Sequence, residues 1–213
     1  LLMQADIAMY QAKAAGRNVI RFFSPDLQNT LVSRVETEND LHLAIEREQF
    51  SLHYQPQWDH GCLVGAEALI RWNHPERGVV APGDFIPLAE ETGLILPLGQ
   101  WVLQTACRQI AAWRDQADMA HLTLAVNVSA LQFRQPNFIN QTLTTLERTG
   151  ADPRRLKLEL TESMLVDNVE DVIAKMLALG SRGVTFSLDD FGTGYSSLSY
   201  LKRLPLDQVK IDR

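Results

Sequence analysis

The sequence predicts an α/β protein in which parallel strands form a (β/α) barrel. From Phe50 onward, candidate strands alternate with helices long enough to connect parallel strands. Five successive strands also carry a charged or amide residue toward the carboxyl end. A barrel gathers such residues in one ring at its C-terminal face, where catalysis occurs in that fold. An open doubly wound sheet would not bring all five together so directly, and the barrel is therefore the favoured class.

The first fifty residues predict helices and one short strand. Residues 1–16 are expected to form a helix that Gly16 closes, and residues 19–23 a strand. A helical linker is expected over residues 25–39. A second helix is expected over residues 40–48, directly before the alternating part of the chain.

The rest of the chain alternates between the two element types. Strands are expected at residues 51–57, 63–72, 122–129, 156–162, 184–190 and 207–212. Helices are expected at residues 84–91, 95–115, 137–149, 168–179 and 195–203. The helix at 95–115 has the clearest apolar stripe, and no internal repeat interrupts the pattern.

Alternate residues of a strand share one face, which separates polar from apolar positions. One face of each strand carries Val, Leu, Ile, Phe and Ala, which are suited to packing under helices. The other face carries polar residues near the carboxyl end, namely Glu67, Asn127, Glu159, Asp189 and Lys210. We therefore expect these five side chains to meet.

Composition excludes several classes of protein. The 213 residues are 46% hydrophobic and carry a formal net charge of -6 without a block of five like charges, which argues against polymeric nucleic acid as a partner and against a polybasic membrane anchor. The two cysteines form no CxxC pair, and the five histidines show no zinc-binding spacing. Reduced thiols predict a cytoplasmic location. Because the chain begins at Leu1 rather than Met, a membrane anchor is expected only in a missing upstream segment.

The polar ring predicts a site for hard divalent cations. Four oxygen ligands come from Glu67, Asn127, Glu159 and Asp189, and Asp190 supplies a fifth. Oxygen ligands favour Mg²⁺ or Mn²⁺ over zinc or copper. Two such ions about 4 Å apart form the clamp used for phosphoryl hydrolysis.

Two basic residues fit the same chemistry. Lys210 can hold the attacking water or a phosphate oxygen, and Arg71 can contact a second phosphate. A simpler structural role remains open for both. For Lys210 the alternative is an ion pair with Asp189 or Glu159, and for Arg71 it is stacking on Trp72.

Structural roles are also open for the other polar residues of the ring. The Asp189-Asp190 pair is equally compatible with capping a turn, and Asn127 with bonding to backbone at a strand end. Glu162 is expected to fix the following loop by hydrogen bonds rather than to bind metal. Gly192-Thr193-Gly194 is interpreted as a turn rather than a phosphate loop.

The motifs resemble those of EAL-domain cyclic-di-GMP phosphodiesterases over about residues 40–213. They are YQP at 54–56, EALIRW at 67–72, FIPLAEETG at 85–93, NVS at 127–129, ELTE at 159–162, DDFGTGYSSL at 189–198 and KID at 210–212. The resemblance implies a TIM-like barrel of the EAL type whose first strand is antiparallel to the others. It also implies hydrolysis of cyclic di-GMP to linear pGpG with Mg²⁺ or Mn²⁺. We expect the domain to face the cytoplasm, whether or not the parent protein is anchored in a membrane.

The resemblance also assigns expected roles. Glu67, Asn127, Glu159 and Asp189 would hold metal, Asp190 would serve the second ion, and Lys210 would act on the water. Gln55, Leu69 and Arg71 would contact the ligand. The loop from Asp190 to Ser197 would couple the metal site to a homodimer interface that involves the following helix.

The amino-terminal residues resemble a different family. The sequence ADIAMYQAKAAGRN at residues 5–18 resembles the closing segment of a GGDEF (diguanylate cyclase) domain. We therefore expect three parts: a GGDEF-like remnant at 1–24, a helical linker at 25–39 and an EAL-like domain at 40–213.

One departure from the family concerns the length of the chain. The family barrel has eight strands, whereas this sequence stops after the sixth, so a further acidic residue and a ligand-contacting Gln of the family cannot be assigned. We expect the sequence to be a fragment. If the molecule ended at Arg213, its exposed sheet edges would predict low stability and no turnover.

Two alternatives to the cyclic-di-GMP phosphodiesterase remain at this point. One is a receptor that binds cyclic di-GMP without cleaving it, and the other is a metal-dependent barrel enzyme with another substrate. Because every visible metal ligand of the family pattern is present, the sequence favours the phosphodiesterase.

Overall fold

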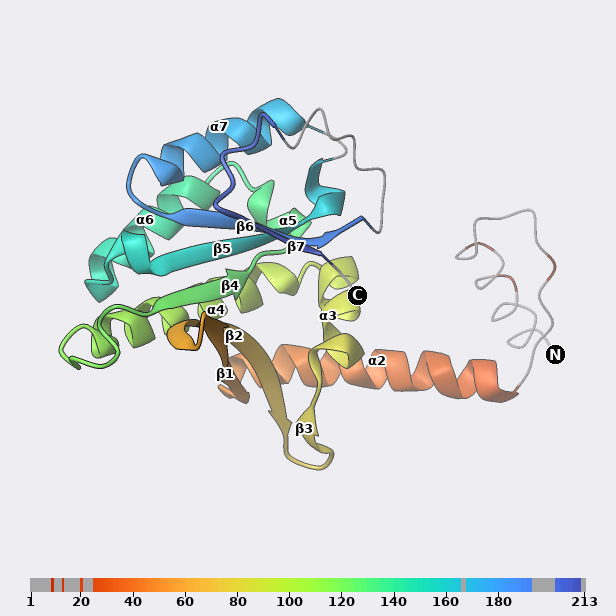
Figure 1. Ribbon diagram of the computed structural model, residues 1–213. Helices are drawn as coiled ribbons and strands as arrows, with labels where there is room; N and C mark the ends of the chain where they lie inside the picture. The colour runs from red at the N-terminus through yellow and green to blue at the C-terminus, as the bar shows by residue number, and fades with distance from the viewer. Residues whose placement is uncertain are drawn as a thin grey trace.

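The computed structural model describes residues 25–165, 168–192 and 202–211, together with positions 9, 13 and 20. The strands are β1 (Phe50–Asp59), β2 (Cys62–His74), β3 (Gly78–Val80), β4 (Thr123–Asn127), β5 (Leu156–Thr161), β6 (Thr185–Phe191) and β7 (Gln208–Ile211). The helices are α2 (Pro25–Glu46), α3 (Pro82–Thr92), α4 (Ile95–Trp113), α5 (Ala130–Phe133), α6 (Phe138–Thr149) and α7 (Val169–Gly180), with short 3-10 helices η1 (Pro153–Arg155) and η2 (Glu162–Leu165) (Figure 1).

All strands of the described part form one mixed sheet in the order β1-β2-β4-β5-β6-β7, with β3 paired to β2. Strand β1 is antiparallel to β2. The remaining pairs along this order, from β2–β4 to β6–β7, are all parallel. The predicted α/β class and the antiparallel first strand are therefore confirmed. Within the described residues the sheet is open, with β1 and β7 at its edges.

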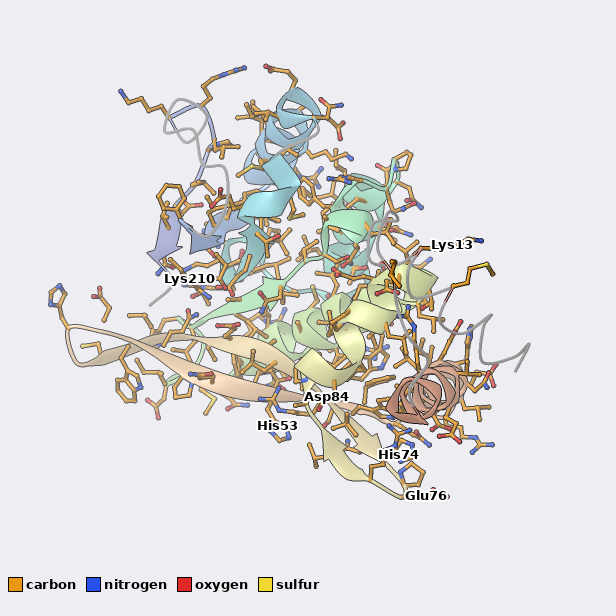
Figure 2. The ribbon with its side chains drawn as sticks, turned by 90° about the vertical axis from the view of Figure 1, so that its right-hand side faces the viewer. Lys13, His53, His74, Glu76, Asp84 and Lys210 are labelled. Atoms are coloured by element: carbon orange, nitrogen blue, oxygen red, sulfur yellow. The ribbon has the colours of Figure 1, made fainter. Side chains whose placement is uncertain are left out.

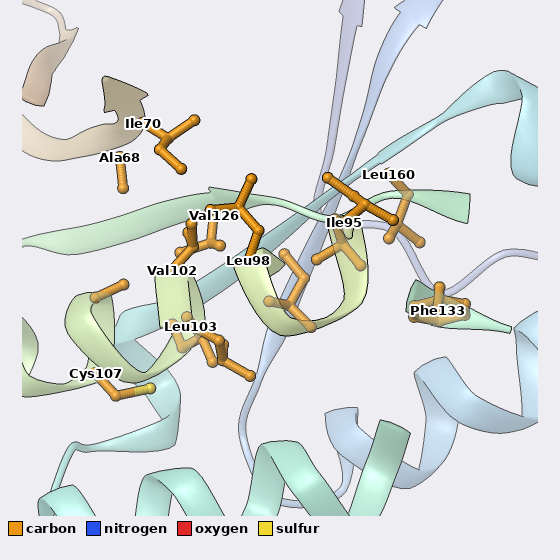
Figure 3. Close-up of a cluster of buried hydrophobic side chains, with 14 of the residues drawn as sticks. Ala68, Ile70, Ile95, Leu98, Val102, Leu103, Cys107, Val126, Phe133 and Leu160 are labelled. Atoms are coloured by element: carbon orange, nitrogen blue, oxygen red, sulfur yellow. The ribbon is translucent and has the colours of Figure 1, made fainter. Parts of the chain in front are cut away.

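The core lies between the sheet and the helices. Helices α4, α6 and α7 cover the same face of the sheet (Figure 1). Figure 3 shows Leu98 and Val102 of α4 beside Val126 of β4, and all three side chains are at most 8% exposed. Burying one such side chain contributes about 1.5–3 kcal/mol relative to leaving it in water. This apolar layer fixes the helix-bearing face and leaves the other face for polar residues.

Strand β2 shows how the two faces are separated. Its residues Ala68, Ile70 and Trp72 are buried, while the intervening Glu67, Leu69 and Arg71 are only partly covered. The period of two follows from the pleat of a strand. The alternation expected from the sequence is therefore confirmed in the strand that carries the first predicted ligand.

Strand β2 also approaches β4 unusually closely at Gly65, which pairs with Thr123. A Cβ atom placed on Gly65 would lie 2.5 Å from the carbonyl oxygen of Thr123. Only a residue without a side chain fits there, so Gly65 sets the distance between the two strands.

Helix α2 lies beside α3 at the β1–β2 side of the molecule, opposite α7 (Figure 1). His74 Nε2 lies 3.3 Å from Asp40 Oδ2 of α2, and Arg77 donates to the same oxygen at 3.1 Å. Arg34 of α2 bonds to Glu91 of α3. Buried Leu41 supplies the apolar part of this contact.

Two of the predicted helices are in fact one. The break expected at residue 40 is absent, because Leu41 and Ala44 continue the helical spacing and are fully buried against the domain. The other predicted strands and helices within the described residues agree with the structure to within about two residues at most ends. The sequence analysis did not predict β3, α5, η1 or η2, each of which is four residues or shorter.

Some predicted elements cannot be compared with the structure. The helix at 1–16 and the strand at 19–23 lie outside the described residues except for positions 9, 13 and 20, and the helix at 195–203 does so except for 202 and 203. No described helix is both long enough and apolar enough to cross a membrane.

Candidate active site

Five neighbouring parallel strands bring the predicted polar residues together. Glu67 lies on β2, Asn127 ends β4, Glu159 lies on β5, Asp189 on β6 and Lys210 on β7. Because β2, β4, β5, β6 and β7 run in parallel, these positions meet toward the carboxyl ends of the strands. Figure 2 shows Lys210 on the side of the sheet away from α4.

Lys210 is the centre of the cluster. Its Nζ donates to Glu159 Oε2 at 2.6 Å and to Glu67 Oε2 at 3.1 Å, and it lies 3.5 Å from Asp189 Oδ2. The ammonium group therefore occupies a position shared by three carboxylates. Of the two roles considered for Lys210, the pairing with Glu159 and Asp189 is present in this structure.

Two more hydrogen bonds orient the carboxylates. Asn127 Nδ2 donates to Glu67 Oε1 at 2.8 Å, and Ser187 Oγ donates to Glu159 Oε1 at 3.3 Å. The bond to Glu67 uses the amide nitrogen of Asn127 and does not involve its amide oxygen. Ser187 is fully buried and was missed by the sequence analysis, although it lies two residues before Asp189 and hence on the same strand face.

The electrostatics of the cluster are unusual because Glu159 is buried. Burial raises the pKa of the Glu159 carboxyl, the hydrogen bond from Lys210 opposes this shift, and the charges of Glu67 and Asp189 add to it. Burial also works against the charge of Lys210. The hydrogen bond to Glu159 and the negative charges of Glu159 and Glu67 outweigh this effect of burial, so the pKa of Lys210 is raised.

The residues fit a divalent metal by donor type and by charge. Three carboxylates and one ammonium group sum to a charge of -2, and the atoms that can ligate a cation are the carboxylate oxygens, because the protonated nitrogen of Lys210 has no free electron pair. A hard divalent cation would neutralise that charge. Within the described residues, no group of three or more Asp, Glu, His or Cys side chains is already arranged to hold a metal ion.

The three residues expected to contact ligand lie next to this cluster. Gln55 of β1 is directly opposite Glu67 in the antiparallel register, which places it on the same face. Leu69 and Arg71 follow Glu67 along that face of β2. Arg71 Nη1 donates to the carbonyl oxygen of Ile70 at 2.8 Å, so its guanidinium lies against its own strand.

Glu162 lies just after β5, at the beginning of η2. Its Oε2 accepts a hydrogen bond from the backbone N–H of Gly192 at 3.1 Å, which ties η2 to the end of β6. This contact is the kind of loop-fixing hydrogen bond that the sequence analysis expected. The side chain of Asp190, the fifth predicted ligand, lies outside the described part of the structure.

A cavity of about 640 Å³ opens beside the cluster, between the ends of β2 and β4 and helices α3, α4 and α5. Its walls are mainly apolar and include Leu69, Ile86 and Leu98, while Asn127 connects it to the carboxylates. Its polar lining residues are Glu90, Ser129, Gln132, Arg134 and Thr161. The sequence analysis missed this cavity because its walls come from two strands and three helices, and no local sequence pattern reveals how these elements are spaced.

The fold and the site define the class of protein. The EAL domain family model matches residues 38–213, and the chain belongs to this family.

The chain is 45% identical over 215 aligned residues to the bifunctional diguanylate cyclase/cyclic di-GMP phosphodiesterase MucR of Pseudomonas aeruginosa, with all of this chain and 31% of that protein aligned. It is 40% identical to the cyclic di-GMP phosphodiesterase PdeR of Escherichia coli, again with all of this chain and 32% of that protein aligned. The chain thus spans about a third of the length of these curated relatives.

Solved structures agree with this assignment. The structure described as PaMucR phosphodiesterase in complex with c-di-GMP has a TM-score of 0.79 and 46% identity, covering 83% of this chain and 72% of that one. The EAL enzyme Bd1971, in its cAMP- and cyclic-di-GMP-bound form, has a TM-score of 0.80 and 29% identity, covering 99% of this chain and 56% of that one.

Proposed function

We propose that this chain is the EAL portion of a cyclic-di-GMP phosphodiesterase and hydrolyses one P–O bond of the cyclic dinucleotide to give linear pGpG. The observation that carries the proposal is the cluster of Glu67, Glu159 and Asp189 around Lys210, with Asn127 bound to Glu67. Relatives that share all of this chain are named phosphodiesterases of cyclic di-GMP.

We propose Mg²⁺ or Mn²⁺, two ions per site, as the cofactor. Glu67, Asn127, Glu159 and Asp189 would hold the metal, and Asp190 would serve the second ion. When bound, such ions lower the pKa of a water molecule and neutralise charge that develops on the phosphate. Lys210 would hold that water or a non-bridging phosphate oxygen by donating a hydrogen bond, a role its raised pKa supports because the group stays protonated.

The cavity beside Asn127 would take one guanine base. Its apolar walls suit a flat aromatic ring, and its polar lining offers partners for the edge of the base. Leu69 would contact the sugar and base, while Gln55 and Arg71 would contact the phosphates from β1 and β2. Arg71 would have to leave the carbonyl oxygen of Ile70 to do so.

Further parts of the proposal concern the setting of the domain. Cys62 and Cys107 are both free thiols, and Cys62 is exposed, which supports a reducing cytoplasmic location. We also propose that the domain forms a homodimer through the loop and helix after Asp190. Residues 1–24 would be the remnant of a GGDEF-like domain, and residues 25–39 the linker to the EAL domain.

One observation favours a second candidate, a receptor that binds cyclic di-GMP without hydrolysing it. Lys210 already pairs with three carboxylates, so the acidic cluster has a cationic partner within the chain. In a receptor this arrangement would persist when ligand binds. In the enzyme, Lys210 would share the carboxylates with divalent cations.

Product analysis separates the two functions. The full-length protein is incubated with cyclic di-GMP and Mg²⁺ or Mn²⁺, and binding is measured in parallel with Ca²⁺. Formation of pGpG supports the enzyme, whereas binding without pGpG formation supports the receptor. Glu67→Ala should abolish turnover, while Glu76→Ala, which changes an exposed acid in the turn after β2, should not. Full turnover by Glu67→Ala would exclude Glu67 as a ligand.

A further inference from the structure

His53 lies on the ligand-facing side of β1, at a position to which no role has yet been assigned. In the antiparallel register, His53 is opposite Leu69, between the pairs Gln55–Glu67 and Ser51–Arg71. Residues directly opposite in such a pair share a face, with Cβ atoms about 5 Å apart. His53 therefore shares its face with Glu67, Leu69 and Arg71.

The side chain of His53 is available for a ligand. It is exposed, whereas its neighbours Leu52 and Tyr54 turn toward the helices and pack against the core. Among the described residues, His53 makes no side-chain hydrogen bond or ion pair, in contrast to Arg71, which bonds to Ile70. Figure 2 shows His53 on the β1–β2 hairpin and Lys210 on β7.

The shape of the ligand indicates what His53 would meet. Cyclic di-GMP carries two phosphates, and the proposed function places the cleaved one at Lys210, with one base in the cavity on the β4 side of β2. With the base in that cavity, we expect the rest of the molecule to extend over β1, which lies on the other side of β2 from β4. There the side chains that can donate hydrogen bonds at the level of Leu69 and Glu67 are His53 and Gln55.

We propose that His53 is a further ligand-contacting residue, which donates a hydrogen bond from its imidazole to the phosphate of cyclic di-GMP that is not cleaved. The proposal rests on the proposed function and deepens it, because it gives β1 a direct part in recognising the second half of the dinucleotide. A contact to the uncleaved phosphate is equally strong before and during the reaction, so it contributes to affinity rather than to the rate of the chemical step.

The test compares His53→Ala, His53→Gln and His53→Phe with the wild type in the full-length protein. The dissociation constant of cyclic di-GMP is measured with Ca²⁺, and kcat and KM with Mg²⁺. Removing a hydrogen bond to a charged group should weaken binding about tenfold. We expect His53→Ala to raise the dissociation constant and KM by this factor while kcat stays within about twofold. His53→Gln, which keeps an N–H donor, should bind almost like the wild type.

The other variants decide between explanations. His53→Phe should bind as weakly as His53→Ala; wild-type affinity in His53→Phe would show that ring stacking matters and would overturn the hydrogen bond. His42→Ala, at an exposed histidine of α2, is the matched control and should change nothing. Unchanged affinity in His53→Ala beside an active wild type refutes the role of His53 alone. A wild type that neither binds nor cleaves cyclic di-GMP refutes the proposed function and this inference together.

Discussion

At the scale of single residues, the site depends on a buried carboxylate. The side chain of Glu159 is fully buried, yet it bonds to Lys210 at 2.6 Å and to Ser187. Burying a charge costs several kcal/mol unless partners compensate, and these two donors are the compensation that the structure provides. The raised pKa of Glu159 shows that the compensation is incomplete.

We therefore expect Glu159→Gln to stabilise the metal-free protein while abolishing turnover. The folded state raises the pKa of Glu159, so the charged form is held less favourably in the folded than in the unfolded chain. This cost is present at about pH 8 and disappears as the pH falls below the unfolded-chain pKa of about 4.3. In the presence of a chelator, the variant should gain about 1 kcal/mol near pH 8 and progressively less toward acid pH.

Thermal unfolding across this pH range measures the effect. Glu76→Gln is the control, because it changes an exposed acid in the turn after β2. A gain in Glu159→Gln that does not vary with pH, or a loss of stability near pH 8, would contradict the explanation by burial of charge.

The residues of the ring could be predicted because each lies near the carboxyl end of a strand and obeys the period of two. Glu67, Glu159 and Lys210 meet for this reason alone. Ser187 and His53 obey the same period but were not selected, since a lone hydroxyl or imidazole gives no local signal of the partner it will meet. Metal ligation by these residues stays a prediction.

At the scale of elements, the pairing of β2 with β4 depends on Gly65. A methyl group there would lie 2.5 Å from both the carbonyl oxygen and the Oγ1 of Thr123, and the backbone carbonyl cannot move without loss of strand pairing. We expect Gly65→Ala to lower the free energy of unfolding by about 2 kcal/mol. The midpoint of urea unfolding measures this, provided that the slope of the transition is unchanged.

Gly180→Ala serves as the matched control for Gly65→Ala. No atom lies within 4 Å of a Cβ atom placed on Gly180, at the end of α7. This substitution should therefore be neutral or slightly stabilising. Equal midpoints for the two variants would show that β2 can move away from Thr123 at no cost.

Long elements could be predicted and short ones could not. Strands such as β5 and helices such as α4 have enough residues to show a period, whereas β3 and α5 have three and four. The false break in α2 has a different cause: a polar run at residues 36–40 resembles a helix end, but burial of Leu41 and Ala44 carries the helix through it.

At the scale of the whole molecule, the proposed metal site would link the stability of the sheet to the presence of divalent cations. Strands β2, β5 and β6 each hold one carboxylate of a group whose charge sums to -2 with Lys210, so a cation bound there would hold distant parts of the sheet together. We expect saturating Mg²⁺ or Mn²⁺ to raise the melting temperature by roughly 5 °C relative to a chelator.

Melting curves at constant ionic strength test this prediction. The shift should be much smaller in Glu67→Ala, which lacks one carboxylate of the cluster, and absent with a monovalent salt. An equal shift in Glu67→Ala would mean that the ions bind elsewhere on the molecule.

The direction of β1 has a consequence for how the chain enters the domain. Because β1 is antiparallel to β2, it begins at the end of the sheet toward which β2 runs, the end that carries Asn127 and Lys210. Three residues connect α2 to Phe50, and Gln49 among them bonds through its carbonyl oxygen to Asn73 and through its side chain to Trp72. A rotation of α2 about its axis would therefore be transmitted through this three-residue connection to the end of the sheet that carries the site, without passing along the length of the sheet.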